Sequence, residues 1–369
     1  MISSTYLLRV VNSKEWILNC RAARAPNMKN DGNSMKILIT DYVFPNLDPE
    51  KKALELTDVE LVIAPDGSEE TLTELAGDVD GILTCFAKVT DKVIENAINL
   101  KVIARYGVGV DNIAVNKATE LGIAVTYVPD YCVDEVADHV FSFLLAWNRQ
   151  VINFDYNTKM KGWGSVDLNL PMNRLRGSTI GVIGFGRIGR NVAEKAKAFG
   201  MHVLVTDPFV ASDLVNKDID VVPIKDLLEK SDFVTIHSPL NNETKGMISI
   251  NEFRVMKKNC FIINCARGPL IDETALISAL ESGEIAGAGL DVLESDHPEN
   301  NNKLFKMNNV IVSPHVAFYS PESTVELQSR AAGSIADVLS GKMPENLYNK
   351  EVVGKTRAKI YEIYIIEIP

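Results

Sequence analysis

The chain has 369 residues, of which 46% are hydrophobic and 24% are charged, and its formal net charge at pH 7 is -11. This length suits two globular domains, and the composition excludes a disordered or fibrous chain. The negative charge argues against binding to nucleic acid or to an anionic membrane, because both are themselves negatively charged.

The first 34 residues show no hydrophobic period, and a loop-like stretch of Asn, Asp and Gly lies just before Met35. We expect residues 1–34 to be a disordered extension, with the folded protein beginning at Met35. A genuine flexible arm and an Arg-containing transit peptide are the alternatives. No apolar run approaches the ~20 residues that span a bilayer, so no membrane association is expected.

Strands are predicted where short apolar, β-branched runs alternate with amphipathic stretches. One series covers residues 36–40, 59–64, 81–85, 101–104 and 123–127, and a second covers 179–184, 202–206, 233–237, 260–264, 286–291 and 310–313. This alternation is typical of parallel sheets flanked by helices. Two series predict an α/β protein with two doubly wound parallel-sheet domains.

The region between the two series contains one clear helical pattern. Residues 134–149 carry apolar side chains on one helical face, and this helix is expected to link the domains. The aromatic residues Phe154, Tyr156 and Trp163 follow, outside any predicted element. They are interpreted either as a satellite core or as an oligomer contact.

A glycine-rich fingerprint begins the second series. The strand at 179–183 ends in Gly184-Phe185-Gly186-Arg187-Ile188-Gly189, and an apolar-faced helix follows. In this context Gly184 permits a tight turn, Gly186 lets a pyrophosphate approach the backbone, and Gly189 lets helix and strand pack closely. The helix N-terminus would then face the phosphates.

An acidic residue follows the next strand at the distance that a dinucleotide site requires. Asp207 comes eighteen residues after Gly189 and can accept hydrogen bonds from the adenosine ribose. No Arg or Lys follows it directly to bind a 2′-phosphate, so the predicted cofactor is NAD. The alternative is a glycine turn that binds no ligand.

Later strand ends carry groups suited to the chemistry of a 2-oxo acid. An enzyme that reduces a 2-oxo acid needs a cation to bind the carboxylate and a proton donor for the carbonyl oxygen. Arg267 follows one predicted strand, Glu294 and Asp296 follow the next, and His315 follows the last. The five cysteines form neither a Cys-x-x-Cys pair nor a metal-binding spacing, which predicts no metal site and favours a reducing, cytoplasmic compartment.

The segments IGVIGFGRIG, INCARGPLIDETAL, AGLDVLESD and SPHVAFYS resemble successive motifs of the D-isomer-specific 2-hydroxyacid dehydrogenases. The resemblance covers residues 35 to 350. Through IARYGVGVDNI, PHVAFYS and PENLYN, the chain is most similar to the branch around the C-terminal binding proteins and phosphoglycerate dehydrogenase-like enzymes. It implies a Rossmann NAD-binding domain, a flavodoxin-like substrate domain and a homodimer formed through the NAD domain.

The resemblance also implies catalytic roles. Arg267 would bind the substrate carboxylate and carbonyl, and His315 would exchange the proton with the substrate oxygen. Asp296 stands where the family has Glu, one methylene longer, and would orient His315; Glu294 is a second candidate. Covalent catalysis by Cys265 is not expected, because no His-Asp relay accompanies it. His139, His202 and His297 are interpreted as structural or solvated.

Further positions match the cofactor and substrate contacts of the family. The cofactor site comprises Gly184, Gly186, Arg187, Ile188, Gly189, Asp207, His237, Pro239, Cys265, Ala266 and Asp291. The substrate site comprises Arg105, Val108, Gly109 and Phe318. Arg105 could instead be a surface residue beside a turn, and Phe318 could serve ordinary packing.

We therefore expect residues 35–128 and 322–350 to form the substrate domain and residues 129–321 to form the NAD-binding domain. The tail 351–369 lies outside the resemblance and could be a docked strand or the product of an altered reading frame. The predicted function is NAD-dependent hydride transfer at C2 of a small D-2-hydroxy or 2-oxo acid. The alternative is an NADH-sensing, protein-binding module of the corepressor type with weak catalysis. A phosphoglycerate dehydrogenase with a regulatory serine-binding domain is not expected, because few residues follow His315.

Overall fold

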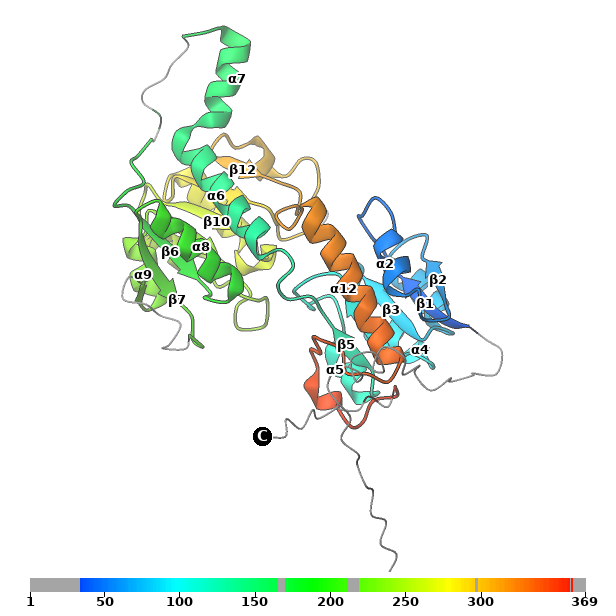
Figure 1. Cartoon of the computed structure of the whole chain (residues 1–369). Coiled ribbons are helices and arrows are strands. Elements are labelled where there is room, and N and C mark those ends of the chain that lie inside the picture. The colour runs from blue at the N-terminus through cyan, green and yellow to red at the C-terminus, as the bar shows by residue number, and fades with distance from the viewer. Residues whose placement is uncertain are drawn as a thin grey trace, which may run out of the picture. The chain divides into compact units, whose positions relative to one another are not determined.

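The computed structural model describes residues 34–164, 170, 172–210, 219–295, 298–358 and 360. Within these residues the chain forms two units, and each comprises more than one stretch of the sequence (Figure 1). The first unit contains residues up to Arg105, then Ala114–Thr126, and the chain from Ala331 onward; the second contains Tyr106–Ile113 and Tyr127–Arg330. The domain boundaries expected from the sequence stay a prediction. Of the expected extension 1–34, only Ser34 lies within the described residues.

The first unit is built on a five-stranded parallel sheet with the order β2-β1-β3-β4-β5, which is the flavodoxin order. Its strands are short, apolar and mostly buried, and two of its helices begin at hydroxyl caps, because Ser68 and Thr90 accept the backbone N–H three residues on. The strands are β1 Met35–Ile39, β2 Val59–Ile63, β3 Gly81–Thr84, β4 Val102–Arg105 and β5 Ala124–Thr126; the helices are α2 Asp48–Ala53, α3 Glu69–Ala76, α4 Asp91–Asn96 and α5 Val115–Glu120.

Residues 347–349 lie along β5, the edge strand of this sheet. Tyr348 donates its N–H to the carbonyl of Val125, and the Asn349 side chain accepts the N–H of Val125 at 2.8 Å. A 3-10 turn, η4 (Lys350–Val352), follows, and the Arg357 guanidinium donates to the carbonyls of residues 97, 98 and 100. Residues 347–357 thus cover backbone groups that an edge strand would otherwise expose.

The second unit is built on a seven-stranded parallel sheet with the order β12-β11-β10-β9-β6-β7-β8. Its strands are β6 Thr179–Ile183, β7 His202–Thr206, β8 Ile219–Val221, β9 Phe233–Ile236, β10 Phe261–Asn264, β11 Gly287–Leu290 and β12 Val310–Val312. The order reverses between β6 and β9, which is the switch point at which Rossmann sheets bind dinucleotides. Both sheets are parallel and helix-flanked, so the predicted fold class is confirmed.

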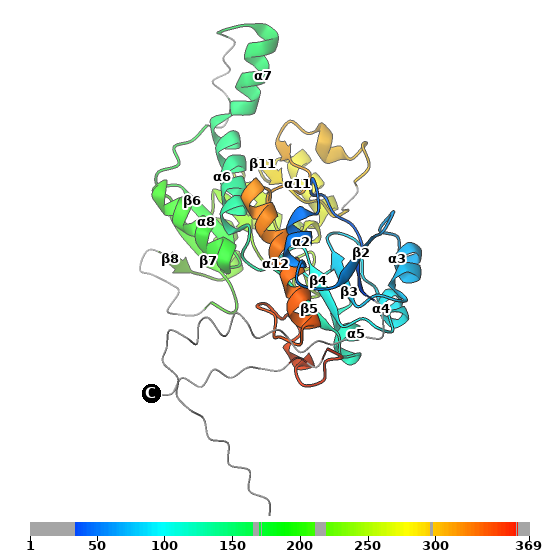
Figure 2. The same ribbon diagram turned by 45° about the vertical axis from the view of Figure 1, so that its right-hand side comes forward.

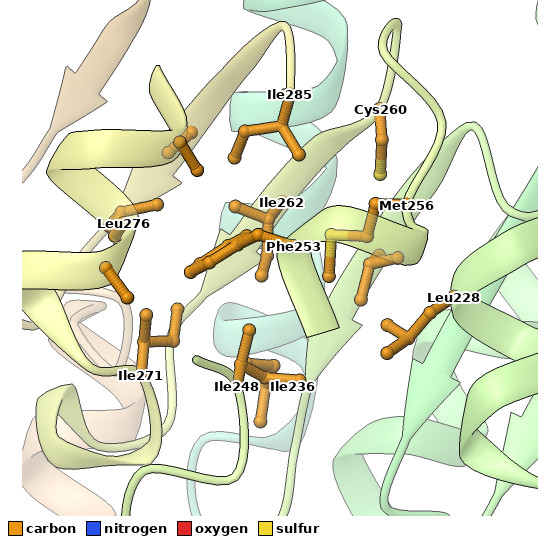
Figure 3. Close-up of a cluster of buried hydrophobic side chains, with 14 of the residues drawn as sticks. Leu228, Ile236, Ile248, Phe253, Met256, Cys260, Ile262, Ile271, Leu276 and Ile285 are labelled. Atoms are coloured by element: carbon orange, nitrogen blue, oxygen red, sulfur yellow. The ribbon is translucent and has the colours of Figure 1, made fainter. Parts of the chain in front are cut away.

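The helices of the second unit are α6 Val133–Arg149, α7 Val151–Lys161, α8 Arg187–Ala198, α9 Ile224–Lys230, α10 Ile250–Val255, α11 Glu273–Ser282 and the start of α12 Pro321–Leu339. Short 3-10 turns, η2 Gly268–Leu270 and η3 Lys303–Lys306, complete it. Helices α6 and α8 pack side by side (Figures 1 and 2). Elsewhere, Phe253 of α10 lies beside Ile262 of β10 at the centre of a fully buried apolar cluster (Figure 3).

Helix α7 was not expected from the sequence. Gln150 adopts a left-handed conformation (φ 54°) and ends α6, after which α7 extends away from the body of its unit (Figures 1 and 2). Phe154 and Tyr156 therefore lie within a helix, and placing them outside any regular element was wrong. The helical pattern is hidden because α7 has no buried residue, so its apolar side chains form no inward face.

Candidate active site

The turn between β6 and α8 has the geometry of a dinucleotide site. Gly184 has φ 93°, and a Cβ there would lie 2.7 Å from the backbone of His237 at the end of β9. A Cβ on Gly189 would lie 2.1 Å from the Gly184 carbonyl oxygen, whereas one on Gly186 would meet nothing within 4 Å. The absence of side chains at Gly184 and Gly189 thus lets α8 pack closely against the end of β6. The backbone at Gly186 is open to a ligand.

Asp207, directly after β7, fixes this turn from the side. Its Oδ2 accepts the Phe185 N–H at 2.7 Å, and its Oδ1 accepts the Phe209 N–H at 2.7 Å. Each carboxylate oxygen can accept a further hydrogen bond, so the ribose hydroxyls could still bind here. The negative charge at this position opposes a 2′-phosphate.

His237 lies at the neighbouring strand end and supports the turn. Its Nε2 is 2.9 Å from the hydroxyl of Thr235, and burial lowers the pKa of its imidazole to about 4. The ring is therefore neutral near pH 7. Pro239 follows on the exposed rim, where its carbonyl accepts the Thr244 hydroxyl at 2.6 Å.

The loop after β10 carries Cys265, Ala266 and Arg267, and the buried Asn264 shapes it. The Asn264 side chain accepts the Ala266 N–H at 3.0 Å and donates to the Arg267 carbonyl at 2.9 Å. Burial raises the pKa of the Cys265 thiol well above its usual value. A neutral thiol at this position supports the expectation that Cys265 is no nucleophile.

Arg267 is brought together with part of the predicted substrate loop. Its Nε lies 3.1 Å from Oδ1 of Asp111, and its Nη1 donates to the Ala266 carbonyl at 2.8 Å. A Cβ on Gly109 would lie 2.1 Å from Nη2, so Gly109 leaves the space that the guanidinium occupies. Val108, beside it, is exposed. The cation is thus oriented by a carboxylate and packed against glycine backbone.

His315 follows β12 in an unusual backbone conformation, with φ 56°. Asp291, at the end of β11, holds it there: the Asp291 carbonyl accepts the His315 N–H at 2.8 Å, and the carboxylate accepts the N–H groups of Val316 and Ala317, each at 2.9 Å. The Phe318 ring lies edge-on to the His315 ring at 6.4 Å. Asp296, the predicted partner of His315, lies outside the described residues.

Arg105 lies in the first unit, at the end of β4. It is buried, and its guanidinium carbon is 6.0 Å from the centre of the Phe86 ring. The interpretation of Arg105 as a surface residue was therefore wrong. The adjoining loop is fixed by Asp41, whose carboxylate accepts the N–H groups of residues 85, 86 and 87 at 2.6–3.1 Å.

The predicted sites thus fall into local groups. Gly184, Gly186 and Gly189 form the turn beside Asp207 and His237, with Arg187 and Ile188 opening α8; Gly109 meets Arg267; and Asp291 and Phe318 adjoin His315. Within the described ranges, no three His, Cys, Asp or Glu side chains gather as a metal site. In the same ranges, no helix has the length and apolar character of a membrane span.

Comparison with known proteins decides the family. The model of the D-isomer specific 2-hydroxyacid dehydrogenase NAD binding domain matches residues 141–317. A glyoxylate reductase from Thermococcus litoralis is 38% identical over 292 residues, which cover 76% of this chain and 87% of that protein. The chain belongs to the D-isomer specific 2-hydroxyacid dehydrogenase family.

Other members extend the match beyond the NAD-binding domain. A D-3-phosphoglycerate dehydrogenase from Methanocaldococcus jannaschii is 38% identical over 331 residues, which cover 88% of this chain and 62% of that protein. A D-lactate dehydrogenase from Aquifex aeolicus, solved with NAD and lactic acid, has a TM-score of 0.77 at 28% identity and covers 83% of this chain. The prediction of an NAD-dependent D-2-hydroxyacid dehydrogenase is confirmed.

The residues present fit NAD. The open backbone at Gly186, the tight packing at Gly189 and the carboxylate of Asp207 are the three features that a pyrophosphate and an unphosphorylated ribose require. The family model and the NAD complexes of related structures agree with this assignment. The cofactor of this dehydrogenase is NAD, as predicted. The individual contacts assigned to it stay predictions.

Several side chains that fix the loops carrying the predicted site residues of each unit were not predicted from the sequence. Asp41, Asp111 and Asn264 act on loops through side-chain contacts that only the folded chain creates. His139 was interpreted as structural or solvated, yet its Nε2 lies 2.8 Å from the Ser313 hydroxyl, which in turn contacts Asp291. The only sequence signal available was the position of Ser313 directly after a predicted strand.

Proposed function

We propose that this dehydrogenase reduces a small 2-oxo acid of the glyoxylate type, with Arg267 binding the carboxylate and His315 providing the proton. One observation supports this above all: Arg267 and His315 follow β10 and β12, which are separated in the sheet by β11 alone. Since parallel strands lie about 4.8 Å apart, the two strand ends are about 10 Å apart. A two- or three-carbon acid fits that spacing.

Arg267 is suited to bind and orient the acid. A guanidinium and a carboxylate form a bidentate, charge-assisted pair, which fixes the direction of the carbonyl group. Asp111 and the Ala266 carbonyl fix one side of the guanidinium before substrate arrives. The positive charge would also polarise the carbonyl and stabilise the negative charge that develops on its oxygen.

His315 completes the reaction as the general acid. The turn at Gly184–Gly189 beside Asp207 would hold NADH, which would supply the hydride for C2. The His315 imidazole would give its proton to the carbonyl oxygen, so that the product would be the 2-hydroxy acid. Oxidation of the hydroxy acid reverses both transfers. Asp296 would orient the imidazole and favour its protonated form, because a neighbouring carboxylate stabilises the imidazolium.

The preference for a short acid is supported by Phe318 and by the relatives. The Phe318 ring lies 6.4 Å from the His315 ring and 6.5 Å from that of Tyr131, so an aromatic wall adjoins the proposed proton donor. Relatives named glyoxylate reductase are 37–40% identical to this chain. We infer that glyoxylate and hydroxypyruvate are better substrates than phenylpyruvate.

The test measures NADH oxidation with glyoxylate, hydroxypyruvate, 2-oxobutyrate and phenylpyruvate. Replacing a general acid typically costs about 10²–10⁴-fold in rate, so His315→Ala should lose that much, and Asp296→Ala should lose a large part of it. Arg267→Gln should raise KM for the acid and also lower kcat, because the guanidinium is proposed both to bind the carboxylate and to stabilise the charge that develops on the carbonyl oxygen. His202→Ala is the matched control, because His202 is exposed at the opposite end of β7. NADH binding without turnover of any acid would instead support the NADH-sensing, protein-binding module.

Within this proposal the enzyme is a homodimer whose contact includes α7. Val151, Ile152, Tyr156 and Met160 of this helix are all more than half exposed, and none of its residues is buried. An apolar row of this kind, on a helix that projects from its unit, is typical of a surface covered by a partner. Light scattering should give a dimer for the wild type and a monomer for Tyr156→Glu/Met160→Glu. Lys159→Glu, on the same helix, is the control.

A cytoplasmic location is the remaining part of the proposal. It is supported by four cysteines, Cys85, Cys132, Cys260 and Cys265, that are free thiols in the described structure. Fractionation of the source cells, followed by immunodetection, tests it directly.

A further inference from the structure

Three polar side chains form a chain of contacts behind the His315 loop. His139 lies on α6, Ser313 directly follows β12, and Asp291 directly follows β11. The His139 Nε2 is 2.8 Å from the Ser313 hydroxyl, and that hydroxyl donates to Asp291 Oδ1 at 2.5 Å. The same Nε2 lies 3.7 Å from Asp291 Oδ1, so the hydrogen-bonded route between the two residues is the one through Ser313. The Asp291 side chain is 1% exposed and that of His139 is 23% exposed, so the contacts run from near the surface to the interior.

The direction of these hydrogen bonds follows from the number of protons. An ionised carboxylate only accepts, so the single hydroxyl proton of Ser313 is donated to Asp291. Ser313 must then accept from His139, which requires the His139 Nε2 to carry a hydrogen. The Phe143 ring holds this imidazole edge-on at 4.7 Å. The order is therefore His139 N–H to Ser313 O–H to Asp291 carboxylate.

Asp291 is the residue that fixes the conformation of the proton donor. Its backbone carbonyl and its carboxylate accept the three successive N–H groups of residues 315, 316 and 317. His315 has φ 56°, a left-handed conformation that only a few per cent of non-glycine residues adopt, although histidine adopts it more often than most. Such a conformation persists only where its surroundings determine it, and here Asp291 supplies those contacts.

We propose that His139 is a positioning residue, which orients Asp291 through Ser313 and thereby holds His315 in its working conformation. The inference rests on the proposed role of His315 as the proton donor. It assigns His139 a function that its place on a linking helix does not suggest. The simpler alternative is that His139 only packs against Phe143.

Two isosteric replacements separate these explanations. Counted from Cβ, the amide nitrogen of Gln occupies the place of the imidazole Nε2, whereas that of Asn occupies the place of Nδ1. His139→Gln can still donate to Ser313, and His139→Asn cannot. If positioning is the role, kcat falls about 10-fold in His139→Asn, since small misplacements of catalytic groups are costly, and stays within about 3-fold of wild type in His139→Gln. The NADH dissociation constant changes less than kcat in both.

A double-mutant cycle shows whether the effect passes through Ser313. Ser313→Ala removes the bridging hydroxyl, so adding His139→Asn to it should lower kcat by no more than about 2-fold further. A full additional 10-fold loss, or equal losses in His139→Asn and His139→Gln, would overturn the proposal. An unchanged kcat in His139→Asn would overturn it as well. His202→Gln controls for loss of a histidine, and melting temperatures establish that each variant is folded.

A readout without turnover keeps this inference separate from the proposed function. The chain has five histidines, so each imidazole resonance can be assigned by single substitution after ¹⁵N-histidine labelling. We expect a slowly exchanging Nε2–H signal from His139 that disappears in Ser313→Ala. We expect the His315 resonances to shift in His139→Asn but not in His139→Gln. If the wild type reduces no acid, the proposed function fails, while these spectra still decide whether His139 positions His315; an unmoved His315 in both variants refutes it.

Discussion

Gly186 and Gly189 lie three residues apart in one turn, yet alanine should affect them in different ways. At Gly186 the backbone (φ -71°, ψ -159°) suits any residue and a Cβ meets nothing within 4 Å. Replacing Gly by Ala at a helix N-cap lowers the free energy of unfolding by a few tenths to about 1 kcal/mol. Alanine also restricts the unfolded chain, which raises the free energy of unfolding by about 0.4–1 kcal/mol. The stability of Gly186→Ala should therefore stay within about 0.5 kcal/mol of wild type.

The same methyl group at Gly186 would stand where we expect the pyrophosphate to approach the backbone. Losing one charge-assisted hydrogen bond costs about 2 kcal/mol, so the NADH dissociation constant should rise about 30-fold. At Gly189 the Cβ would lie 2.1 Å from the Gly184 carbonyl oxygen, whereas real Cβ contacts stay beyond 3.0 Å. Moving α8 away from β6 to relieve this should cost about 1–3 kcal/mol, which is about 2–10 °C in Tm.

Thermal melts and NADH fluorescence titrations of the two variants provide the assay. Gly186→Ala should melt with the wild type and bind NADH weakly, and Gly189→Ala should melt early. Wild-type affinity for NADH in Gly186→Ala would refute the placement of the dinucleotide. An equal loss of Tm in both variants would refute the packing argument.

Three other outcomes are expected. Burial lowers the pKa of His237 to about 4. Below the usual histidine pKa of about 6.5, this side chain therefore binds a proton in the unfolded chain but not in the folded chain. The free energy of unfolding should fall as the pH drops toward 4. The full shift would lower the free energy of unfolding by about 2 kcal/mol at pH 5, and partial exposure of the ring reduces this loss to about 1 kcal/mol. Urea unfolding should show the loss in the wild type, and the loss should be absent in His237→Gln. Gly109→Ala should displace Arg267 and raise KM for the acid about 10-fold, while the affinity for NADH stays unchanged. An unchanged KM would contradict the contact between Gly109 and Arg267. The control is Gly333→Ala, because a Cβ at Gly333 would meet no atom within 4 Å. Burial raises the pKa of three thiols to about 12, those of Cys85, Cys132 and Cys260. Thiol reagents at pH 8 should therefore label these thiols only after unfolding. Rapid labelling of the folded enzyme would contradict their burial.

The sequence predicted most of the strands because they are buried on both faces and therefore read as continuous apolar runs. It missed β8, whose three residues Ile219–Val221 include two exposed positions. It also missed α7, which buries no residue and so lacks an inward apolar face. Hydrophobic periodicity in a sequence arises from burial of one face of a helix or strand, so an element without a buried face shows no such periodicity.

The candidate site divides in the same way. The positions of Arg267 and His315 after strand ends could be predicted, because the strands read as apolar runs and parallel strands end at one edge of a sheet; their catalytic roles stay predictions. Their partners could not: Asp111 is 156 residues from Arg267, and His139 is 174 residues from Ser313. Such pairs depend on how helices and loops pack, which the local sequence does not encode.

The covering of β5 by residues 347–349 affects synthesis on the ribosome. Val125 and Asn349, which bond to each other, are 224 residues apart. At about 5–20 residues per second, the nascent chain exposes the β5 edge for roughly 10–45 s before residue 349 is made. The second unit, which needs no residue beyond Arg330, can fold during that interval. The first unit is begun first and completed last, and its bare edge strand is the place where a nascent chain is exposed to mispairing and where a holdase chaperone would act.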